Sequence, residues 1–202
     1  MKDTITDLLR HGEPVGGRRF RGHGVDDPLS DKGWTQMWHA VGDETGWNRI
    51  VSSPMQRCRA FAEALGEKCQ IPVSLEADLR EVGFGAWEGR SPDEIQAANL
   101  AEYEAFYQDP VRNRPPGAEP LDAFAARVSR AYDRIVADHP GEQLLIVAHA
   151  GVIRAIIGHT LDADPLGWYR IKVQNGGISR IRHGRYGSRL ELLNGRLGAT
   201  RA

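Results

Sequence analysis

The stretch Leu8-Leu9-Arg10-His11-Gly12-Glu13 closes a short apolar run near the amino terminus. A second histidine closes a longer apolar run in Leu144-Leu145-Ile146-Val147-Ala148-His149-Ala150-Gly151. Each histidine therefore stands where a buried strand is expected to end, and ligands of open α/β sheets bind at the carboxyl ends of the strands. We expect both imidazoles and the Arg10 guanidinium at one edge of a sheet, an arrangement that suits an anion such as a phosphoryl group.

The rest of the chain alternates between apolar runs of strand length and segments of helix length, which is typical of an α/β domain with a mostly parallel sheet. Strands are expected over 5–9, 49–52, 72–75 and 144–148, followed by a late hairpin or edge pair over 178–182 and 189–192. Helices are expected over 31–41, 55–68, 93–107, 121–138 and 150–161. We expect residues 1–202 to form a single domain, with 108–120 as a surface excursion that contains four prolines.

The composition argues against several classes of partner. The 26 basic and 27 acidic residues give a formal net charge of −1, so no global field favours nucleic acid or an acidic membrane surface. No apolar run approaches the roughly 18 residues of a membrane-spanning helix, and no signal-type segment opens the chain. We therefore expect a cytoplasmic protein that binds neither nucleic acid nor a membrane, and a homodimer is left open.

The cysteines and histidines give no sign of a disulfide or a metal site. Cys58 and Cys69 lie 11 residues apart on one expected helix, too far for a disulfide along a straight helix, so we expect two buried, reduced thiols. The remaining histidines show no spacing typical of metal ligands, and we expect no metal and no cofactor.

Four separated motifs carry the residues suited to chemistry. They are Arg10 with His11, Arg57 one turn into the helix after the second strand, Glu81 in Leu79-Arg80-Glu81-Val82-Gly83, and His149. Each is weak alone: a histidine at a strand end is more often structural, and a helical arginine is more often exposed. Their combination and order are far more specific than any one of them.

With these motifs in this order, the chain resembles the histidine phosphatase superfamily, whose fold is shared with cofactor-dependent phosphoglycerate mutases. The resemblance runs from about residue 8 to about residue 182. It implies a three-layer α/β/α sandwich with a mostly parallel central sheet. It also implies that His11 is the nucleophile that takes a phosphoryl group, and that Glu81 donates a proton to the leaving group and later activates water. The groups implied to surround the phosphoryl oxygens are Arg10, Arg57, His149 and the backbone of Ala150.

The chemistry of these residue types agrees with those implied roles. A neutral imidazole is a competent nucleophile because its unperturbed pKa is about 6.5. Phosphoryl transfer mainly requires in-line positioning and positive groups on the phosphoryl oxygens, which planar guanidinium groups provide. An alkoxide leaving group needs a proton, which a positioned carboxylic acid supplies.

Two departures from the family pattern bear on the activity. Many members carry an asparagine six residues after the nucleophile, where this chain has Gly17, and we expect Arg21 or the Gly22 amide to take over its phosphate contact. The mutases carry a long basic insertion after the Trp-Glu-Gly segment, whereas this chain continues with an acidic, alanine-rich segment. The missing cations favour hydrolysis of a phosphomonoester over turnover of a bisphosphate, and we expect residues 90–120 to form a lid over the site.

The loop after the first histidine indicates a substrate. Gly16-Gly17-Arg18-Arg19-Phe20-Arg21-Gly22 and Asp27-Pro28-Leu29-Ser30 are similar to the corresponding segments of some bacterial α-ribazole phosphatases. The favoured prediction is thus a metal-independent phosphomonoesterase for a small phosphate ester, with α-ribazole 5′-phosphate of cobalamin biosynthesis as its candidate. Two alternatives stay open: a phosphoglycerate mutase with an unusual lid, and a non-catalytic module that binds phosphorylated ligands.

Overall fold

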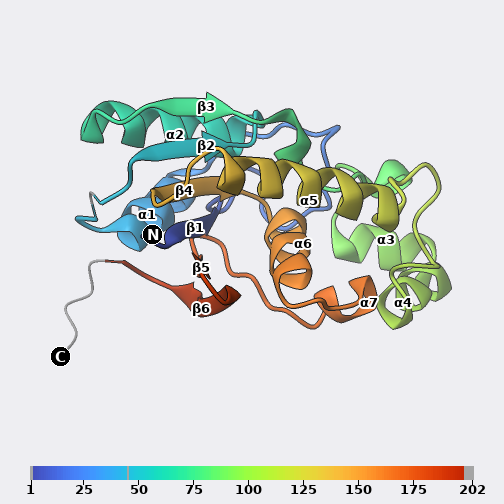
Figure 1. Ribbon diagram of the computed structural model, residues 1–202. Helices are drawn as coiled ribbons and strands as arrows, with labels where there is room; N and C mark the ends of the chain where they lie inside the picture. Colours follow the sequence, from blue (N-terminus) through green and yellow to red (C-terminus); the bar gives the residue numbers. More distant parts are fainter. Residues whose placement is uncertain (1, 45, 198–202) are drawn as a thin grey trace.

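The computed structural model describes residues 2–44 and 46–197 (Figure 1). Within them, a six-stranded sheet has the order β3-β2-β4-β1-β5-β6. Its parallel strands are β1 (Thr4–Arg10), β2 (Arg49–Ser52), β3 (Val73–Leu75) and β4 (Gln143–Ala148). At one edge, β5 (Ile178–Gly184) and β6 (Gly187–Gly195) form an antiparallel hairpin, as the alternating segments predict.

Helices cover both faces of the sheet, which confirms the three-layer α/β/α sandwich (Figure 1). Successive residues of a strand point to opposite faces, so Leu8 packs in the core on one side and Leu9 in the core on the other. The same alternation along β4 explains why its whole run is apolar. The layer against Leu9 contains α1 (Asp31–Val41) and α2 (Gln56–Cys69), and the layer against Leu8 contains α5 (Leu121–Ala137) and α6 (Ala150–Thr160).

The single helix expected over 93–107 is wrong, because the segment forms α3 (Pro92–Ala98) and α4 (Leu100–Gln108). Asn99 ends the first helix with φ −158° and ψ 88°, and its side-chain oxygen accepts the N–H of Glu102 at 3.1 Å to start the second. Asparagine competes in this way with the helical hydrogen bonds of the backbone. A short helix, α7 (Pro165–Trp168), is absent from the sequence prediction because four residues are too few to show a period.

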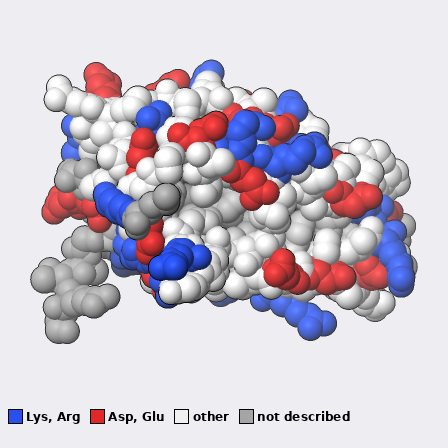
Figure 2. All heavy atoms as spheres, in the orientation of Figure 1, with Lys and Arg blue, Asp and Glu red and all other residues white. Residues whose placement is uncertain are grey.

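The two cysteines both lie on α2, as expected, but they differ in burial. Cys58 is buried and Cys69 is only half-buried, so the expectation of two buried thiols holds for the first alone; both are free thiols. Along the described residues, no helix is long and apolar enough to cross a bilayer. Basic and acidic side chains lie interspersed over the face shown in Figure 2, in keeping with a net charge near zero.

A buried carboxylate ties the central strand to its neighbours. Asp7 is fully buried; Arg180 donates to its two oxygens at 2.7 and 2.9 Å, and the Trp47 Nε1–H donates to it at 2.8 Å. Removing one partner of a buried pair leaves the other charge uncompensated. We expect Asp7→Ala to lower the free energy of unfolding by about 3–5 kcal/mol, measured by chemical denaturation.

A matched control for this prediction is Asp133→Ala. Asp133 is 62% exposed and pairs with His159 at the surface, so we expect its loss to cost less than about 1 kcal/mol. Equal losses of stability in the two variants would contradict the role assigned to Asp7.

Candidate active site

The register between β1 and β4 brings the two histidine motifs together. Arg10 pairs with Ala148 across these parallel strands, and the His11 N–H donates to the Ala148 carbonyl at 3.0 Å. The next residues on the two strands are therefore His11 and His149, whose ring centroids are 5.1 Å apart with an angle of 63° between their planes. The predicted juxtaposition of two imidazoles at one sheet edge is confirmed.

The His11 ring is held in one orientation and one tautomer. Its Nδ1 lies 2.7 Å from the Gly12 carbonyl oxygen, which can only accept, so Nδ1 carries the proton. The lone pair is then on Nε2. Burial, together with the positive charges of Arg10 and Arg57, lowers the pKa of His11 well below its usual range. The imidazole is consequently neutral near pH 7, with a lone pair available for a nucleophilic attack.

Two buried guanidinium groups lie beside His11, and each is anchored by backbone carbonyls. Arg10 donates through Nη1 to the Val173 carbonyl at 2.7 Å, and Arg57 donates to the carbonyls of Val25 and Gly22 at 3.0 and 2.9 Å. The Nε–H groups of both arginines are buried and have no hydrogen-bond partner among the described residues. Burial also lowers the pKa of Arg10 to about 10, which still leaves it charged. Two buried, unpaired N–H donors on cations call for an anion.

His149 lies behind His11 and not on the wall of the pocket. Its Nε2 is 2.8 Å from the Ser53 hydroxyl, and the Cys58 thiol lies 3.6 Å from the same nitrogen. Burial and the charge of Arg57 lower the pKa of His149 well below its usual range, so this ring too is neutral. Its contact with a phosphoryl group stays a prediction, whereas Ala150, at the first turn of α6, does line the pocket.

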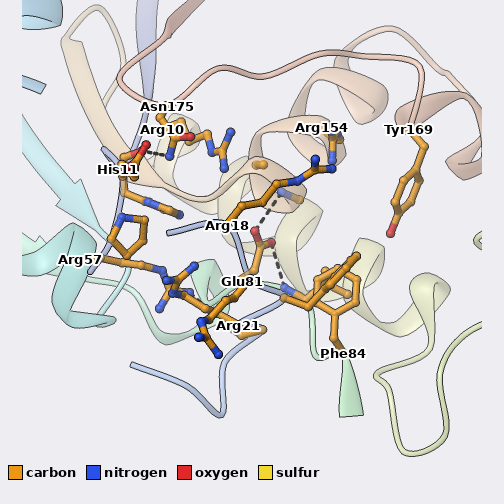
Figure 3. Close-up of a pocket in the computed structure, with 18 of the residues that line it drawn as sticks. Arg10, His11, Arg18, Arg21, Arg57, Glu81, Phe84, Arg154, Tyr169 and Asn175 are labelled. Carbon is orange, nitrogen blue, oxygen red and sulfur yellow. Dashed lines mark hydrogen bonds between the residues drawn. The ribbon is translucent and has the colours of Figure 1, made fainter. Parts of the chain in front are cut away.

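The Glu81 carboxylate points into the same pocket from the loop that follows β3 (Figure 3). One of its oxygens accepts the N–H of Val82 at 3.0 Å, and the other accepts the N–H of Gly151 at 3.3 Å. Arg127 holds the loop in place: it donates a hydrogen bond to the Glu81 carbonyl at 3.3 Å and forms an ion pair with Glu119 at 2.7 Å. Glu81 is thus fixed relative to the first turn of α6.

The loop that was expected to replace the missing asparagine contact lines the pocket, but the Arg21 side chain and the Gly22 carbonyl form hydrogen bonds to other protein groups. Arg21 donates through Nε to Asp27 at 2.8 Å and through Nη2 to the Val15 carbonyl at 2.7 Å. Gly22 turns its carbonyl oxygen toward Arg57. This loop therefore positions Arg57 for the pocket, and direct phosphate contacts from Arg21 or the Gly22 amide stay predictions.

Several residues of the pocket are missing from the sequence prediction. The pocket has a volume of about 380 Å³, and its wall also includes Arg18, Arg154, Tyr169 and Asn175. Figure 3 shows His11 and Arg57 at one end and Tyr169 at the other, with Arg18, Glu81 and Arg154 between them. Two of them had a signal in the sequence: Arg18 lies in the loop over 16–22 that indicates the substrate, and Arg154 lies four residues after Ala150 on one helix and so shares its face.

The segment 90–120, expected as a lid, contributes no residue to the pocket wall. Instead, Phe106 and Ile95 join Trp87 in a small apolar cluster that packs against Phe20 and Phe84, which do line the pocket. The segment supports the wall from behind, and α3 and α4 gather with α7 at one end of the molecule (Figure 1). Its function as a lid stays a prediction.

The described part of the chain contains no group of three or more His, Cys, Asp or Glu side chains placed to hold a metal ion. The polar groups of the pocket are those of an anion site: its wall includes several arginines, the neutral imidazole of His11, and the carboxylates of Glu13 and Glu81.

Comparisons with known proteins agree with this geometry. The sequence profile of the histidine phosphatase superfamily (branch 1) matches residues 7–196. The bifunctional protein Rv2228c of Mycobacterium tuberculosis is 33% identical over 176 residues, which cover 85% of this chain and 48% of that protein. The adenosylcobalamin/alpha-ribazole phosphatase of Salmonella typhimurium is 30% identical over 179 residues, covering 86% and 88%. The solved structure of the mycobacterial glucosyl-3-phosphoglycerate phosphatase Rv2419c has a TM-score of 0.84 at 26% identity, covering 95% and 99%.

The chain thus spans about half the length of the first of these relatives and nearly the whole of the other two. The profile match contains both histidine motifs, Arg57 and Glu81, and the fold is shared along almost the entire chain. The chain belongs to the histidine phosphatase superfamily.

Proposed function

We propose that the protein is a phosphomonoesterase that works through a phosphohistidine on His11 without a metal ion. The observation that carries this proposal is the pairing of a fixed Nε2 lone pair on His11 with two buried, unpartnered Nε–H groups on Arg10 and Arg57. A phosphoryl dianion would satisfy both guanidinium groups and place its phosphorus against the imidazole.

In the first step, His11 Nε2 attacks phosphorus and the bond from phosphorus to the ester oxygen breaks. Glu81 gives its proton to the departing alkoxide, which leaves as an alcohol. In the second step, Glu81 takes a proton from water while the water oxygen attacks phosphorus and the P–N bond breaks. Inorganic phosphate leaves, and His11 and Glu81 return to their starting forms.

Gly151 is required for this placement of Glu81. A Cβ on Gly151 would lie 2.3 Å from Oε1 of Glu81, so an added methyl group must displace the carboxylate. Because misplacing a catalytic group by about 1 Å can cost about 10²-fold, we expect Gly151→Ala to lower kcat for an alkyl phosphate by about that factor. In Gly167→Ala, where a Cβ meets nothing within 4 Å, kcat should stay within about twofold of wild type. Equal kcat values in the two variants would contradict the role of Gly151.

Two observations support different substrates for this phosphatase. The loop over 16–30 and the Salmonella relative support α-ribazole 5′-phosphate, the substrate favoured by the sequence. A phosphoglycerate ester is supported by the neighbouring structure of a glucosyl-3-phosphoglycerate phosphatase and by arginines in the pocket beyond those that face His11. The mutase alternative needs cations for a second phosphate, and because Arg18 and Arg154 line the pocket, isomerisation is measured as well. The binding-module alternative leaves the Glu81 carboxylate without a function.

A hydrolysis screen distinguishes these substrates. We expect the enzyme to release inorganic phosphate from α-ribazole 5′-phosphate or from a phosphoglycerate ester, and to form little 2-phosphoglycerate from 3-phosphoglycerate plus 2,3-bisphosphoglycerate. The rates should persist after prolonged chelation, because the described residues offer no cluster of metal ligands. Efficient isomerisation with negligible phosphate release would overturn the phosphatase proposal. A cytoplasmic location and a homodimer stay predictions.

A further inference from the structure

The pocket carries more positive charge than one phosphoryl group requires. Six arginines line it, namely Arg10, Arg18, Arg19, Arg21, Arg57 and Arg154, against the carboxylates of Glu13 and Glu81. Arg10 and Arg57 balance a phosphoryl dianion, and Arg21 is paired with Asp27 at 2.8 Å. Glu13 is likewise paired, with Lys32 at 2.8 Å. Three arginines beyond the phosphoryl position, Arg18, Arg19 and Arg154, are therefore set against one remaining carboxylate of the pocket, that of Glu81.

Of these, Arg19 has a structural task. Its Nε donates to the Gly16 carbonyl at 3.2 Å and its Nη1 donates to the Gly89 carbonyl at 2.6 Å, which fastens the loop after β1 to the segment after Glu88. Arg18 and Arg154 remain as cations that face the open part of the pocket.

Arg154 is fixed in place. Its Nε donates to the Ile171 carbonyl at 2.8 Å, and its guanidinium lies 5.5 Å from the centroid of the Tyr169 ring. Tyr169 is in turn held by Arg114, whose Nη1 donates to the tyrosine hydroxyl at 3.1 Å. A guanidinium that is already oriented loses little conformational freedom when it binds a planar anion.

Arg18 complements Arg154 from the loop after β1. Its side chain is exposed and extends over the pocket between Arg57 and Arg154 (Figure 3). The acidic residues of 90–110 do not line this pocket, although Glu104 and Tyr107 border a neighbouring hollow together with Arg18. The region beyond the phosphoryl position is therefore cationic, contrary to the expectation from the local sequence.

We propose that Arg18 and Arg154 form a second anion subsite, which selects phosphate monoesters whose leaving group carries a carboxylate. The inference rests on the proposed phosphatase function and names the substrate class of that same pocket. Arg154 supplies the oriented guanidinium, and Arg18 adds charge at the mouth. A phosphate ester with an uncharged leaving group occupies the phosphoryl position without engaging either arginine.

Binding of phosphonates tests this subsite without any turnover, because their C–P bond is not hydrolysed. Isothermal titration compares 3-phosphonopropionate, which bears a carboxylate, with n-propylphosphonate, which has the same chain length and none. We expect wild type to bind the carboxylate compound about tenfold more tightly or better, and this preference to shrink as the ionic strength rises. Arg154→Gln and Arg18→Gln should each reduce the preference, while the affinity for n-propylphosphonate stays within about twofold.

The controls separate recognition from a structural role. Arg112 lies outside the pocket with its side chain 87% exposed, so Arg112→Gln should keep the wild-type preference. Arg154→Lys keeps the charge and should retain part of the preference that Arg154→Gln loses. Three results would overturn the subsite. Wild type could bind the two phosphonates with equal affinity, the glutamine variants could lose affinity equally for both, or neither compound could bind. Hydrolysis of p-nitrophenyl phosphate by the same samples tests the phosphatase proposal separately.

Discussion

His11→Ala should abolish both turnover and the covalent adduct. We expect the rate of phosphate release to fall by about 10⁴-fold or more, because no other group in the pocket offers a fixed, unprotonated nitrogen to phosphorus. Quenching wild type with a ³²P-labelled ester under alkaline conditions should trap an adduct that survives alkali and is lost in acid, as a phosphohistidine is. The same quench on His11→Ala should trap nothing.

The control for this prediction is His159→Ala, which removes an exposed histidine that pairs with Asp133 far from the pocket. It should keep the wild-type rate and the adduct. An equally strong adduct in His11→Ala would show that another residue takes the phosphoryl group. Because the lowered pKa of His11 keeps its ring neutral, the rate of adduct formation should not fall between pH 7.5 and pH 6 through protonation of this nucleophile.

Glu81→Gln should have the second-largest effect, and its size should depend on the leaving group. General-acid catalysis is typically worth about 10²–10⁴-fold, and we expect a loss in that range for transfer from an alkyl phosphate to His11. p-Nitrophenolate leaves without a proton, so transfer from p-nitrophenyl phosphate should lose far less. Rapid-quench measurement of the adduct isolates this first step from the later hydrolysis.

A conservative control for this substitution is Glu63→Gln on the exposed side of α2, where the side chain is 60% exposed. It should change neither rate. Equal losses for the two leaving groups in Glu81→Gln would show that Glu81 positions the ester and does not protonate it. The amide of glutamine can still accept the N–H groups of Val82 and Gly151, so the loop should keep its place.

The sequence predicts the end of the pocket that holds His11, because the position where a strand ends is a local property of the chain. Apolar runs locate β1 and β4, and the residue after each strand is a histidine at the same sheet edge. The sequence also predicts His149 among the groups around the phosphoryl oxygens. That contact stays a prediction, and the structure packs the His149 ring against His11, Ser53 and Cys58. Which side of a ring faces a pocket depends on side-chain packing from α2, which no strand pattern contains.

The helix boundary at Asn99 is a second feature that the sequence pattern did not predict. The apolar spacing over 93–107 indicates one helix, and the competing side-chain bond from Asn99 to the Glu102 N–H divides it in two. The acidic residues of this segment were expected to lie over the site as part of a lid. They do not line the pocket, because the apolar side of these helices, with Ile95 and Phe106, turns toward Phe20 and Phe84.

The sequence by itself determined the α/β class, the mostly parallel sheet with its late hairpin, and the meeting of His11 with His149. These depend on periodicity and on the rule that parallel strands share one carboxyl edge. Only the tertiary structure decided which cations enter the pocket and which are paired elsewhere. Arg21 pairs with Asp27, 6 positions along the chain, and Arg154 is oriented by Ile171 and Tyr169, which lie 17 and 15 positions along the chain. Charge in a pocket depends on such side-chain pairings across the fold, and the local pattern of the chain does not encode them.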